Sequence, residues 1–344
     1  SEGFDREHLD LPDQHNALIT AVCAANPNTV VVLANGAPVT MPWINQVPAV
    51  IEGYLGGQAS GSGLADALMG VQNPAGKLAE TFPLNLKDVP CTPFFPGERR
   101  QMQYREGVYV GYRYYDTARR DVLFPFGHGQ SYTDFAYVEA NTSNASLTAD
   151  GSITLSVTIK NTGKRAGAEV IQVYRHSRSS ATHQPEQQLC GFAKVFLQSL
   201  EVATVTIELD AENFRAFDHG TNQWVLEAGA VQLRIGSSSR DIRLTQAINV
   251  VSTHTFSDVA KTTGAPEFLS PAHPQALDVS DALFRNMLNR PVPEGEDIRP
   301  FHRNSSLAEI STTWLGSKVY EKALAGFLGG MGLQNADPTT RKMF

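Results

Sequence analysis

The first residues of the chain, SEGFDREHLDLP, carry side chains that could perform acid–base chemistry. Glu2 has a carboxyl group that could donate or accept a proton, and Asp5 and Arg6 form an adjacent pair of opposite charge. From spacing alone, a solvated carboxylate is the simpler interpretation of Glu2, because acidic residues near chain ends are common. Nothing in so short a segment could hold a charged loop in place, which suggests that it belongs to something larger.

Other candidate chemistries find less support in the sequence. None of the nine histidines shows a metal-binding spacing such as H-E-x-x-H, and His128, His176 and His183 are better explained as turn or surface residues. The three cysteines, Cys23, Cys91 and Cys190, are too far apart for a metal knuckle or a disulfide framework. We therefore expect no cofactor and no metal.

A glycine-rich segment, GYLGGQASGSGLADAL, could be taken for a phosphate-binding turn. Glycines at 56, 57, 61 and 63 do not fit G-x-G-x-x-G, and Ser60 and Ser62 do not fit the G-x-S-x-G nucleophile elbow. A tight turn that lets a strand and a helix pack closely is the better explanation. Trp43, in MPW, could be a sugar platform, although a core or interface tryptophan is favoured.

Composition indicates a globular protein of two or three domains. The chain has 344 residues, 42% of them hydrophobic, and a net charge of −7 without long charged runs, which argues against a nucleic-acid partner. No apolar run is long enough for a membrane span. Cysteine usage favours a reducing compartment and hence the cytoplasm; glycosylation patterns at Asn141, Asn144 and Asn304 leave a secreted or periplasmic location open.

The pattern of elements changes along the chain. A helix is expected from Leu11 through LPDQHNALITAVCAA, followed by two strands, TVVVLANG and AVIEGY, and a short helix, GLADALMG, ending at Gly70. The unbroken apolar runs predict strands buried on both faces of a parallel sheet. Two strands are too few for such a sheet, so we expect its earlier strands to lie on another stretch of polypeptide.

Later segments alternate with a period of two, as in SITLSVTIKN and ATVTIEL, and about seven short strands predict an antiparallel sandwich of immunoglobulin or fibronectin type. The expected domains are residues 1–82 as an α/β part, 83–134 as an aromatic-rich connector, 135–250 as the β-sandwich, and 251–344 as a linker and helical tail. The aromatic residues expected to join the domains are Phe94, Phe95, Tyr104, Tyr112, Tyr114 and Tyr115. In the tail, Leu307, Ile310, Trp314, Val319, Ala323 and Phe327 are expected on one helix face.

An ordered series of motifs resembles the C-terminal half of glycoside hydrolase family 3 β-glucosidases. The motifs are SEGFDREHLDLPDQHNALITAV, NPNTVVVLANGAPVTMPW, GYLGGQASGSGLADALMG, NPAGKLAETFP, YREGVYVGYRYYD, FPFGHGQSYTDF, VTIKNTGKRAGAEVIQVY, LCGFAKVFL and GSSSRDIRL. The resemblance runs from Ser1 to about Leu244. It implies the later part of an (α/β)6 sandwich layer followed by a fibronectin type III-like domain, with a (β/α)8 barrel on polypeptide outside this chain.

The resemblance also implies roles for the first residues. Glu2 matches the family's general acid/base, which protonates the departing glycosidic oxygen and then activates water, and its pKa is therefore expected above that of the nucleophile. Asp5 and Arg6 would support the loop. The nucleophile would be an Asp on the barrel.

These implications define a retaining, exo-acting β-glucosidase that acts on a β-glucoside or oligosaccharide. The expected partner is a separate or cleaved chain with the (β/α)8 barrel and the catalytic Asp; a homo-oligomer stays open, and no nucleic acid or membrane partner is expected. A non-catalytic carbohydrate-binding or scaffolding module is the alternative from another class. Relatives acting on xylosides, arabinosides or N-acetylglucosaminides remain further alternatives, because the residues that choose the sugar would mostly lie on the barrel.

Overall fold

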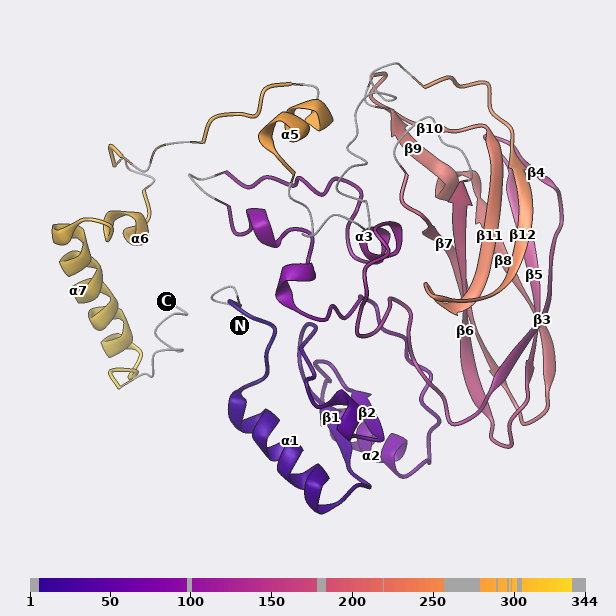
Figure 1. Ribbon diagram of the computed structural model, residues 1–344, viewed down its shortest axis with the longest axis horizontal. Coiled ribbons are helices and arrows are strands. Elements are labelled where there is room, and N and C mark those ends of the chain that lie inside the picture. Colours follow the sequence, from indigo (N-terminus) through magenta and orange to yellow (C-terminus); the bar gives the residue numbers. More distant parts are fainter. Residues whose placement is uncertain are drawn as a thin grey trace. The chain divides into compact units, whose positions relative to one another are not determined.

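The structure is a computed structural model of the chain, and it describes residues 6–97, 101–177, 184–218, 220–256, 279–288, 290–295, 297, 299–301 and 305–335 (Figure 1). The chain divides into two compact units. The first unit comprises Ser1–His8, Phe94–Tyr104 and Pro293–Phe344, and the second comprises Leu9–Pro93 and Arg105–Val292. The second unit contains both an α/β layer and a β-sandwich.

The α/β layer has two helices and two strands: α1 (Asp13–Ala25), β1 (Val30–Leu33), β2 (Ala49–Glu52) and α2 (Ser60–Leu68). The strands pair in parallel, with Val30 opposite Ala49 and Leu33 opposite Glu52. Helix α1 begins directly after Pro12, whose φ of −51° suits the start of a helix. The predicted order of helix, strand, strand and helix is confirmed.

The core of this layer lies on one face of the two strands. Val31 and Leu33 are buried in one cluster with Trp43 and Phe82. On the opposite face, Val30 and Val32 are 44% and 38% exposed. The prediction that these strands are buried on both faces is therefore wrong for the described chain, since successive side chains of a strand point to opposite faces and only one face is covered.

The described residues of the connector, 83–97 and 101–134, include η2 (Leu86–Asp88), η3 (Thr92–Phe94) and α3 (Tyr112–Thr117). Phe82 and Phe124 form an isolated antiparallel bridge, in which the Phe82 N–H donates to the Phe124 carbonyl at 2.9 Å. On α3, Tyr114 and Tyr115 are fully or nearly buried. The connector is therefore tied to the α/β layer by backbone hydrogen bonds as well as by its aromatic side chains.

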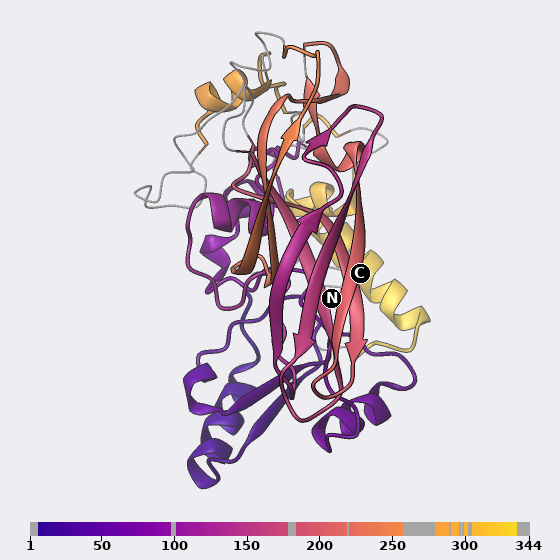
Figure 2. The same ribbon diagram turned by 90° about the vertical axis from the view of Figure 1, so that its right-hand side faces the viewer.

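The β-sandwich consists of a five-stranded sheet in the order β4-β12-β11-β6-β7 and a three-stranded sheet in the order β3-β5-β8 (Figure 2). Its strands are β3 (Phe135–Thr142), β4 (Ser146–Leu147), β5 (Ser152–Asn161), β6 (Gly167–Ser177), β7 (Gln188–Leu197), β8 (Val202–Asp210), β11 (Gly229–Ser238) and β12 (Asp241–Val250). A turn, η4 (Ala211–Phe214), leads into a separate hairpin of β9 (Arg215–Asp218) and β10 (Gln223–Leu226). The predicted antiparallel sandwich is confirmed.

The apolar residues that alternate in the sequence form the core of the sandwich. Ile153, Leu155, Val157 and Ile159 of β5 are all fully buried, and they pack in one cluster with residues of the facing sheet. The residues of strand β3 alternate poorly between buried and exposed positions, and its pairing with β5 shifts in register between Tyr137 and Glu139. Patterning therefore reveals strands with regular alternation, such as β5 and β8, more readily than strands in which the alternation is irregular.

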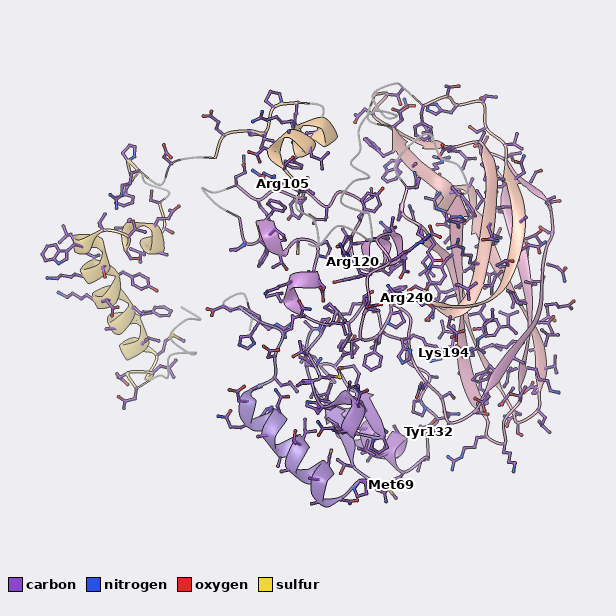
Figure 3. The ribbon with its side chains drawn as sticks, viewed as in Figure 1. Met69, Arg105, Arg120, Tyr132, Lys194 and Arg240 are labelled. Atoms are coloured by element: carbon purple, nitrogen blue, oxygen red, sulfur yellow. The ribbon has the colours of Figure 1, made fainter. Side chains whose placement is uncertain are left out.

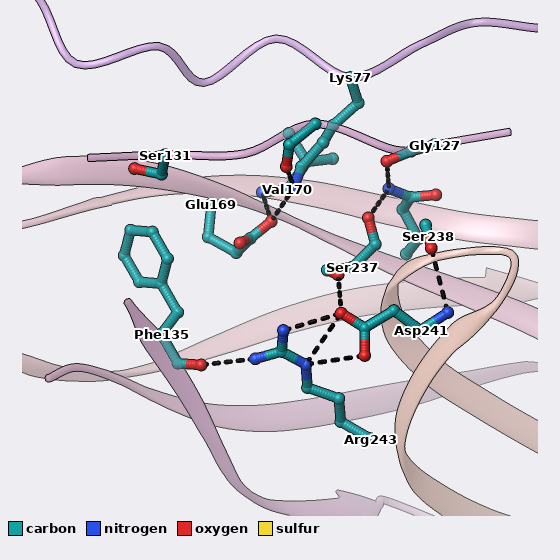
Figure 4. Close-up of polar contacts among 12 residues, drawn as sticks. Lys77, Gly127, Ser131, Phe135, Glu169, Val170, Ser237, Ser238, Asp241 and Arg243 are labelled. Carbon is teal, nitrogen blue, oxygen red and sulfur yellow. Dashed lines mark hydrogen bonds and ion pairs between the residues drawn. The ribbon is translucent and has the colours of Figure 1, made fainter. Parts of the chain in front are cut away.

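A buried ion pair joins the segment that follows α2 to the sandwich (Figure 4). Lys77 Nζ lies 2.9 Å from Glu169 Oε1 on β6 and donates to the Gly129 carbonyl at 2.9 Å. Nearby, Arg243 Nη2 lies 2.8 Å from Asp241 Oδ2, and Nη1 donates to the Phe135 carbonyl at 2.6 Å. The buried charges of Lys77 and Glu169 need such partners, because an isolated buried charge would lose its hydration without compensation.

The region predicted as a linker contains a helix, α5 (Asp281–Leu288), in the second unit. Arg105 binds it through an ion pair with Asp281, a hydrogen bond to the Val279 carbonyl and a position over the Phe284 ring. The buried Arg105 guanidinium therefore holds this helix, and the assignment of the region as a linker stays a prediction. Among the described residues, no helix has both the length and the hydropathy needed to cross a bilayer.

The tail of the first unit forms two helices, α6 (Leu307–Ile310) and α7 (Trp314–Gly330). Ser306 caps α6 in a capping box with Glu309, and Thr313 caps α7 by accepting from the Gly316 N–H. The prediction that the apolar residues of the tail lie on one helix face is wrong, because the helix is interrupted between Ile310 and Trp314. On α7, Trp314, Val319 and Phe327 are 75%, 50% and 54% exposed, whereas Leu328 is buried.

Candidate functional site

The structure describes only part of the predicted catalytic segment. Glu2 and Asp5 lie outside the described residues. Arg6 is described and is exposed. The described chain continues from Arg6 to α1 and includes the residues that follow the predicted acid/base segment.

The segment that follows Arg6 is anchored by the loop after β1. Thr40 in this loop donates its backbone N–H to the Leu9 carbonyl at 2.9 Å and its hydroxyl to Asp10 Oδ1 at 2.5 Å. Leu9 is itself buried. The chain is therefore fixed at a point only a few residues beyond the motif that contains Glu2.

Trp43, which follows Thr40 in the same loop, binds helix α1. Its side chain is 1% exposed, and its indole N–H donates to Asn16 Oδ1 at 2.9 Å. The favoured interpretation of Trp43 as a core residue is confirmed, because so buried a ring offers no face to a sugar. Its role is to hold the first turn of α1 against the loop that carries Thr40.

Polar side chains gather where β1 and β2 end. Asn35 follows β1 and donates to Glu52 Oε2 at 3.2 Å and to the Ala37 carbonyl at 2.9 Å, and the Tyr54 N–H donates to Glu52 Oε1 at 2.8 Å. Burial raises the pKa of Glu52, and the negative charge of Glu80 adds to this effect. The carboxyl ends of parallel strands are the usual place for binding sites in α/β sheets.

Tyr54 adopts an uncommon backbone conformation in this cluster. Its φ is 48°, in the left-handed region that bulky residues rarely occupy. Burial, followed by the charge of Glu80, raises the pKa of the Tyr54 hydroxyl, so this group stays protonated. A strained residue held beside a carboxylate is typical of sites where the fold imposes a geometry on the loop that follows.

The glycine-rich turn after β2 is tight at its start. A Cβ on Gly53 would lie 3.0 Å from the Leu33 carbonyl oxygen, and one on Gly56 would overlap Ser60. By contrast, a Cβ on Gly57, Gly61 or Gly63 would meet nothing within 4 Å. Close packing therefore requires glycine only at the beginning of the turn.

The described histidines and cysteines form no metal site: no group of three or more His, Cys, Asp or Glu side chains in the described chain could hold an ion. Burial and the nearby Lys77 lower the pKa of His128. His176 Nδ1 lies 2.6 Å from the Glu186 carbonyl, and His183 lies outside the described residues. The three cysteines are free thiols.

The connector aromatics fall into two groups. Tyr112 stacks on Phe126 with ring centroids 4.6 Å apart, contacts the Tyr174 ring edge to face, and accepts a hydrogen bond from the Leu189 N–H. This confirms Tyr112 as a link between connector and sandwich. Phe95 and Tyr104 are 47% and 69% exposed, and their expected role in joining the domains stays a prediction.

Asn73 links α2 to the sandwich and was not apparent from the sequence. Its amide donates to the Ala166 carbonyl at 3.0 Å and accepts from the Ser131 hydroxyl at 2.9 Å and the Tyr132 N–H at 2.7 Å. The Tyr132 hydroxyl in turn donates to the Ala67 carbonyl at the end of α2 (Figure 3). The α/β layer and the sandwich are thus joined by specific hydrogen bonds.

Some of these residues had a signal in the sequence. Glu52 is a lone carboxylate in the apolar run AVIEGY, and a charge in a buried strand often marks a polar site. Asp10 and Thr40 had none, because their pairing depends on a loop that returns from a distance of thirty residues.

Comparison with known proteins places two domains on the chain. Residues 1–132 match the family model of the glycosyl hydrolase family 3 C-terminal domain, and residues 169–239 match that of a fibronectin type III-like domain. The first match contains the Glu2 motif, the Thr40 loop and the carboxyl ends of β1 and β2.

Similar proteins are much longer than this chain. Thermostable beta-glucosidase B of Acetivibrio thermocellus is 44% identical over 299 residues, which are 84% of this chain and 39% of that protein. An exo-α-(1→6)-L-arabinopyranosidase of Bifidobacterium breve is 42% identical over 249 residues, 72% of this chain and 32% of that protein. The crystal structure of a GH3 beta-glucosidase from Bifidobacterium adolescentis has a TM-score of 0.69 and 35% identity, covering 93% of this chain and 41% of that one.

Proposed function

The chain belongs to glycosyl hydrolase family 3, of which it carries the C-terminal domain, and we propose that it supplies the general acid/base of a retaining, exo-acting β-glucosidase. The observation that carries this proposal is the family match that begins at residue 1 and includes Glu2 in SEGFDREHLDLP. The hydrolysis of terminal, non-reducing β-D-glucosyl residues is the activity proposed.

In the proposed reaction, the Glu2 carboxyl donates its proton to the glycosidic oxygen while the bond from that oxygen to the anomeric carbon breaks. A carboxylate of the partner polypeptide bonds to the same carbon and forms a glycosyl ester. Glu2, now a carboxylate, takes a proton from water, whose oxygen attacks the anomeric carbon and releases the nucleophile. Retaining enzymes perform these two steps with carboxyl groups about 5–5.5 Å apart.

The described residues support this role by positioning the segment. Thr40 fixes the chain at Leu9 and Asp10, and Trp43 fixes the start of α1 through Asn16. Asp5 and Arg6 are proposed to hold the loop itself by ion pairing or backbone hydrogen bonds. Anchoring at nearby points reduces the conformational freedom of the loop, which favours proton transfer in a defined direction.

The nucleophile is proposed to be an Asp on a (β/α)8 barrel carried by a separate or cleaved chain. The chain spans 39% of the Acetivibrio relative, so most of that relative has no counterpart here. Native and denaturing mass spectrometry of the purified protein tests the partner. A native species heavier than the 37.4 kDa chain that releases a barrel-sized polypeptide on denaturation supports it; this chain alone would contradict it.

The role of Glu2 is tested by Glu2→Gln in the assembly with the barrel-bearing polypeptide. We expect hydrolysis of aryl β-glucosides with poor leaving groups to fall at least about 100-fold, because these depend on a general acid. With substrates that have good leaving groups, the glycosyl ester should still form, but its hydrolysis should be lost. Added azide should restore turnover, because it replaces the activated water.

A matched control is Glu7→Gln, which removes a carboxylate from the same segment. It should leave the rate and the pH profile close to those of the unchanged protein. Unchanged hydrolysis by Glu2→Gln at the optimum pH would show that another group is the acid/base.

Two alternatives are kept. A non-catalytic carbohydrate-binding or scaffolding module would bind sugars calorimetrically without turnover. A family relative with other substrates, such as β-xylosides, would hydrolyse those instead, and the similarity to the Bifidobacterium breve arabinopyranosidase adds aryl α-L-arabinopyranosides to the substrates worth measuring.

The cytoplasm is the proposed compartment, because a reducing environment suits three free thiols.

A further inference from the structure

A hollow of about 470 Å³ lies between the end of α3 and the hairpin of β11 and β12, within the second unit. Its wall includes side chains that the proposed reaction does not use: Asp116, Arg119, Arg234, Ser239, Arg240 and Thr245. Its volume lies within the range of about 300–1,000 Å³ that is usual for small-molecule sites.

Positive charge prevails in this hollow. Arg240 Nε pairs with Asp116 Oδ1 at 2.8 Å, and Arg234 Nη2 pairs with Glu186 Oε1 at 2.9 Å. The Arg119 guanidinium is exposed and has no hydrogen bond or ion pair with any described residue. Three guanidinium groups therefore face two carboxylates, which leaves one positive charge without a counterion.

Hydrogen-bond donors are also in excess. Both Asp116 oxygens already accept, from Arg240 Nε at 2.8 Å and from Gln187 Nε2 at 3.1 Å. Ser239 is 3% exposed, and its hydroxyl makes no hydrogen bond of normal geometry with a described residue. Burial raises the pKa of Asp116, and the contacts with Arg240, Gln187 and Ser239 oppose this effect. A ligand that accepts hydrogen bonds would satisfy Ser239 and Arg119 together.

The backbone at Arg119 supports the same interpretation. Its φ is 51°, a left-handed conformation that costs energy for a residue with a long side chain. The Arg120 N–H, donating to the Tyr115 carbonyl at 2.9 Å, fixes the chain just after this residue, and the Arg120 carbonyl accepts from Arg240 Nη2 at 2.7 Å. The fold thus holds Arg119 in an unfavourable conformation at the rim of the hollow, as is common for residues at binding sites.

We propose that this hollow binds a small oxyanion, the carboxylate or phosphate group of a metabolite of about monosaccharide size. The planar guanidinium of Arg119 can bind two oxygens of such a group at once, and the hydroxyls of Ser239 and Thr245 donate to the remaining oxygens. The volume of the hollow leaves room beside the oxyanion for a sugar ring. This proposal does not depend on the catalytic role of Glu2.

Isothermal titration of the full chain with inorganic phosphate, with glucuronate and with glucose tests the proposal. We expect saturable binding of at least one of the two anions and no comparable binding of glucose. Binding of phosphate alone would identify a phosphate site, and binding of glucuronate alone a carboxylate site. The absence of saturable anion binding, or glucose binding as strong as that of the anions, would overturn the proposal.

Two substitutions separate a specific site from a general charge effect. Arg119→Gln should weaken anion binding at least about tenfold, since charge-assisted hydrogen bonds to an arginine would be lost. Arg285→Gln removes an exposed arginine from α5, outside the hollow, and should bind like the unchanged protein. Equal binding by Arg119→Gln and the unchanged protein, or equal weakening by both variants, would contradict the site; unchanged melting temperatures would show that both variants are folded.

Discussion

Thr40 and Asp10 are joined by a side-chain hydrogen bond of 2.5 Å, while the Thr40 N–H binds the carbonyl of neighbouring Leu9 at 2.9 Å. The two contacts come from one residue and hold two successive residues of the segment that follows the Glu2 motif. Because the loop of Thr40 begins at the carboxyl end of β1, the sheet itself determines where this segment lies.

Replacing Thr40 with Val should destabilise the chain by about 0.5–1 kcal/mol, since it removes the hydroxyl that Asp10 accepts from and keeps the shape of the side chain. Urea unfolding followed by fluorescence measures the change. Thr40→Ser keeps the hydroxyl and should recover most of the loss. If Thr40→Val and the unchanged chain unfold at the same urea concentration, this hydrogen bond contributes nothing to stability.

Trp43 should tolerate truncation poorly. Trp43→Ala should cost about 3–5 kcal/mol, because the ring is 1% exposed and its removal leaves a cavity in the core of the α/β layer. Trp224 is 64% exposed and provides a control, with an expected cost of only about 0.5–1.5 kcal/mol for Trp224→Ala, because its ring contacts that of Phe217 edge to face. Similar midpoints of thermal unfolding for the two variants would show that the Trp43 core is not formed in solution.

Asn73→Ala should weaken the link between the α/β layer and the sandwich. It removes an amide that bonds to Ala166, Ser131 and Tyr132, and we expect a loss of about 2–3 kcal/mol. Calorimetry should then show the two parts unfolding at more separate temperatures. Asn28→Ala, at an exposed turn, should change neither the midpoint nor the shape of the transition.

Two carboxyl groups should affect stability in opposite ways as the pH changes. Burial, as the largest cause, raises the pKa of Glu52 above its ordinary value of 4.5, so the folded state holds the proton more tightly than the unfolded state does. The stability of the unchanged chain relative to Glu52→Gln should therefore fall as the pH rises from that value towards the folded pKa.

Asp241 should show the reverse. The Arg243 hydrogen bonds, the largest cause, lower the pKa of Asp241 below its ordinary value of 3.8. The Asp241 carboxylate therefore stabilises the folded state at pH values above 3.8. This stabilisation is lost as the pH falls towards the pKa of Asp241 in the folded state. Free energies of unfolding of Asp241→Asn and Glu52→Gln, measured in parallel at several pH values, give the two slopes; slopes of the same sign would contradict one of the two assignments.

The sequence by itself determined the kinds of layers and the family. Strict alternation in β5 needs no partner to be recognised, because a period of two follows from strand geometry alone, and those residues do form the sandwich core. The sequence signals for the helix after Pro12 are also local. Ordered motifs gave the resemblance that the family matches then confirmed.

Only the tertiary structure decided which residues meet across long separations. The pairing of Thr40 with Asp10, the three contacts of Asn73 and the unpaired position of Arg119 depend on loops brought together by packing, and no local pattern encodes such distances. The burial of β1 was misjudged for the same reason. An apolar run shows that a strand can be covered on both faces, but whether a face is covered depends on which elements are present to pack against it.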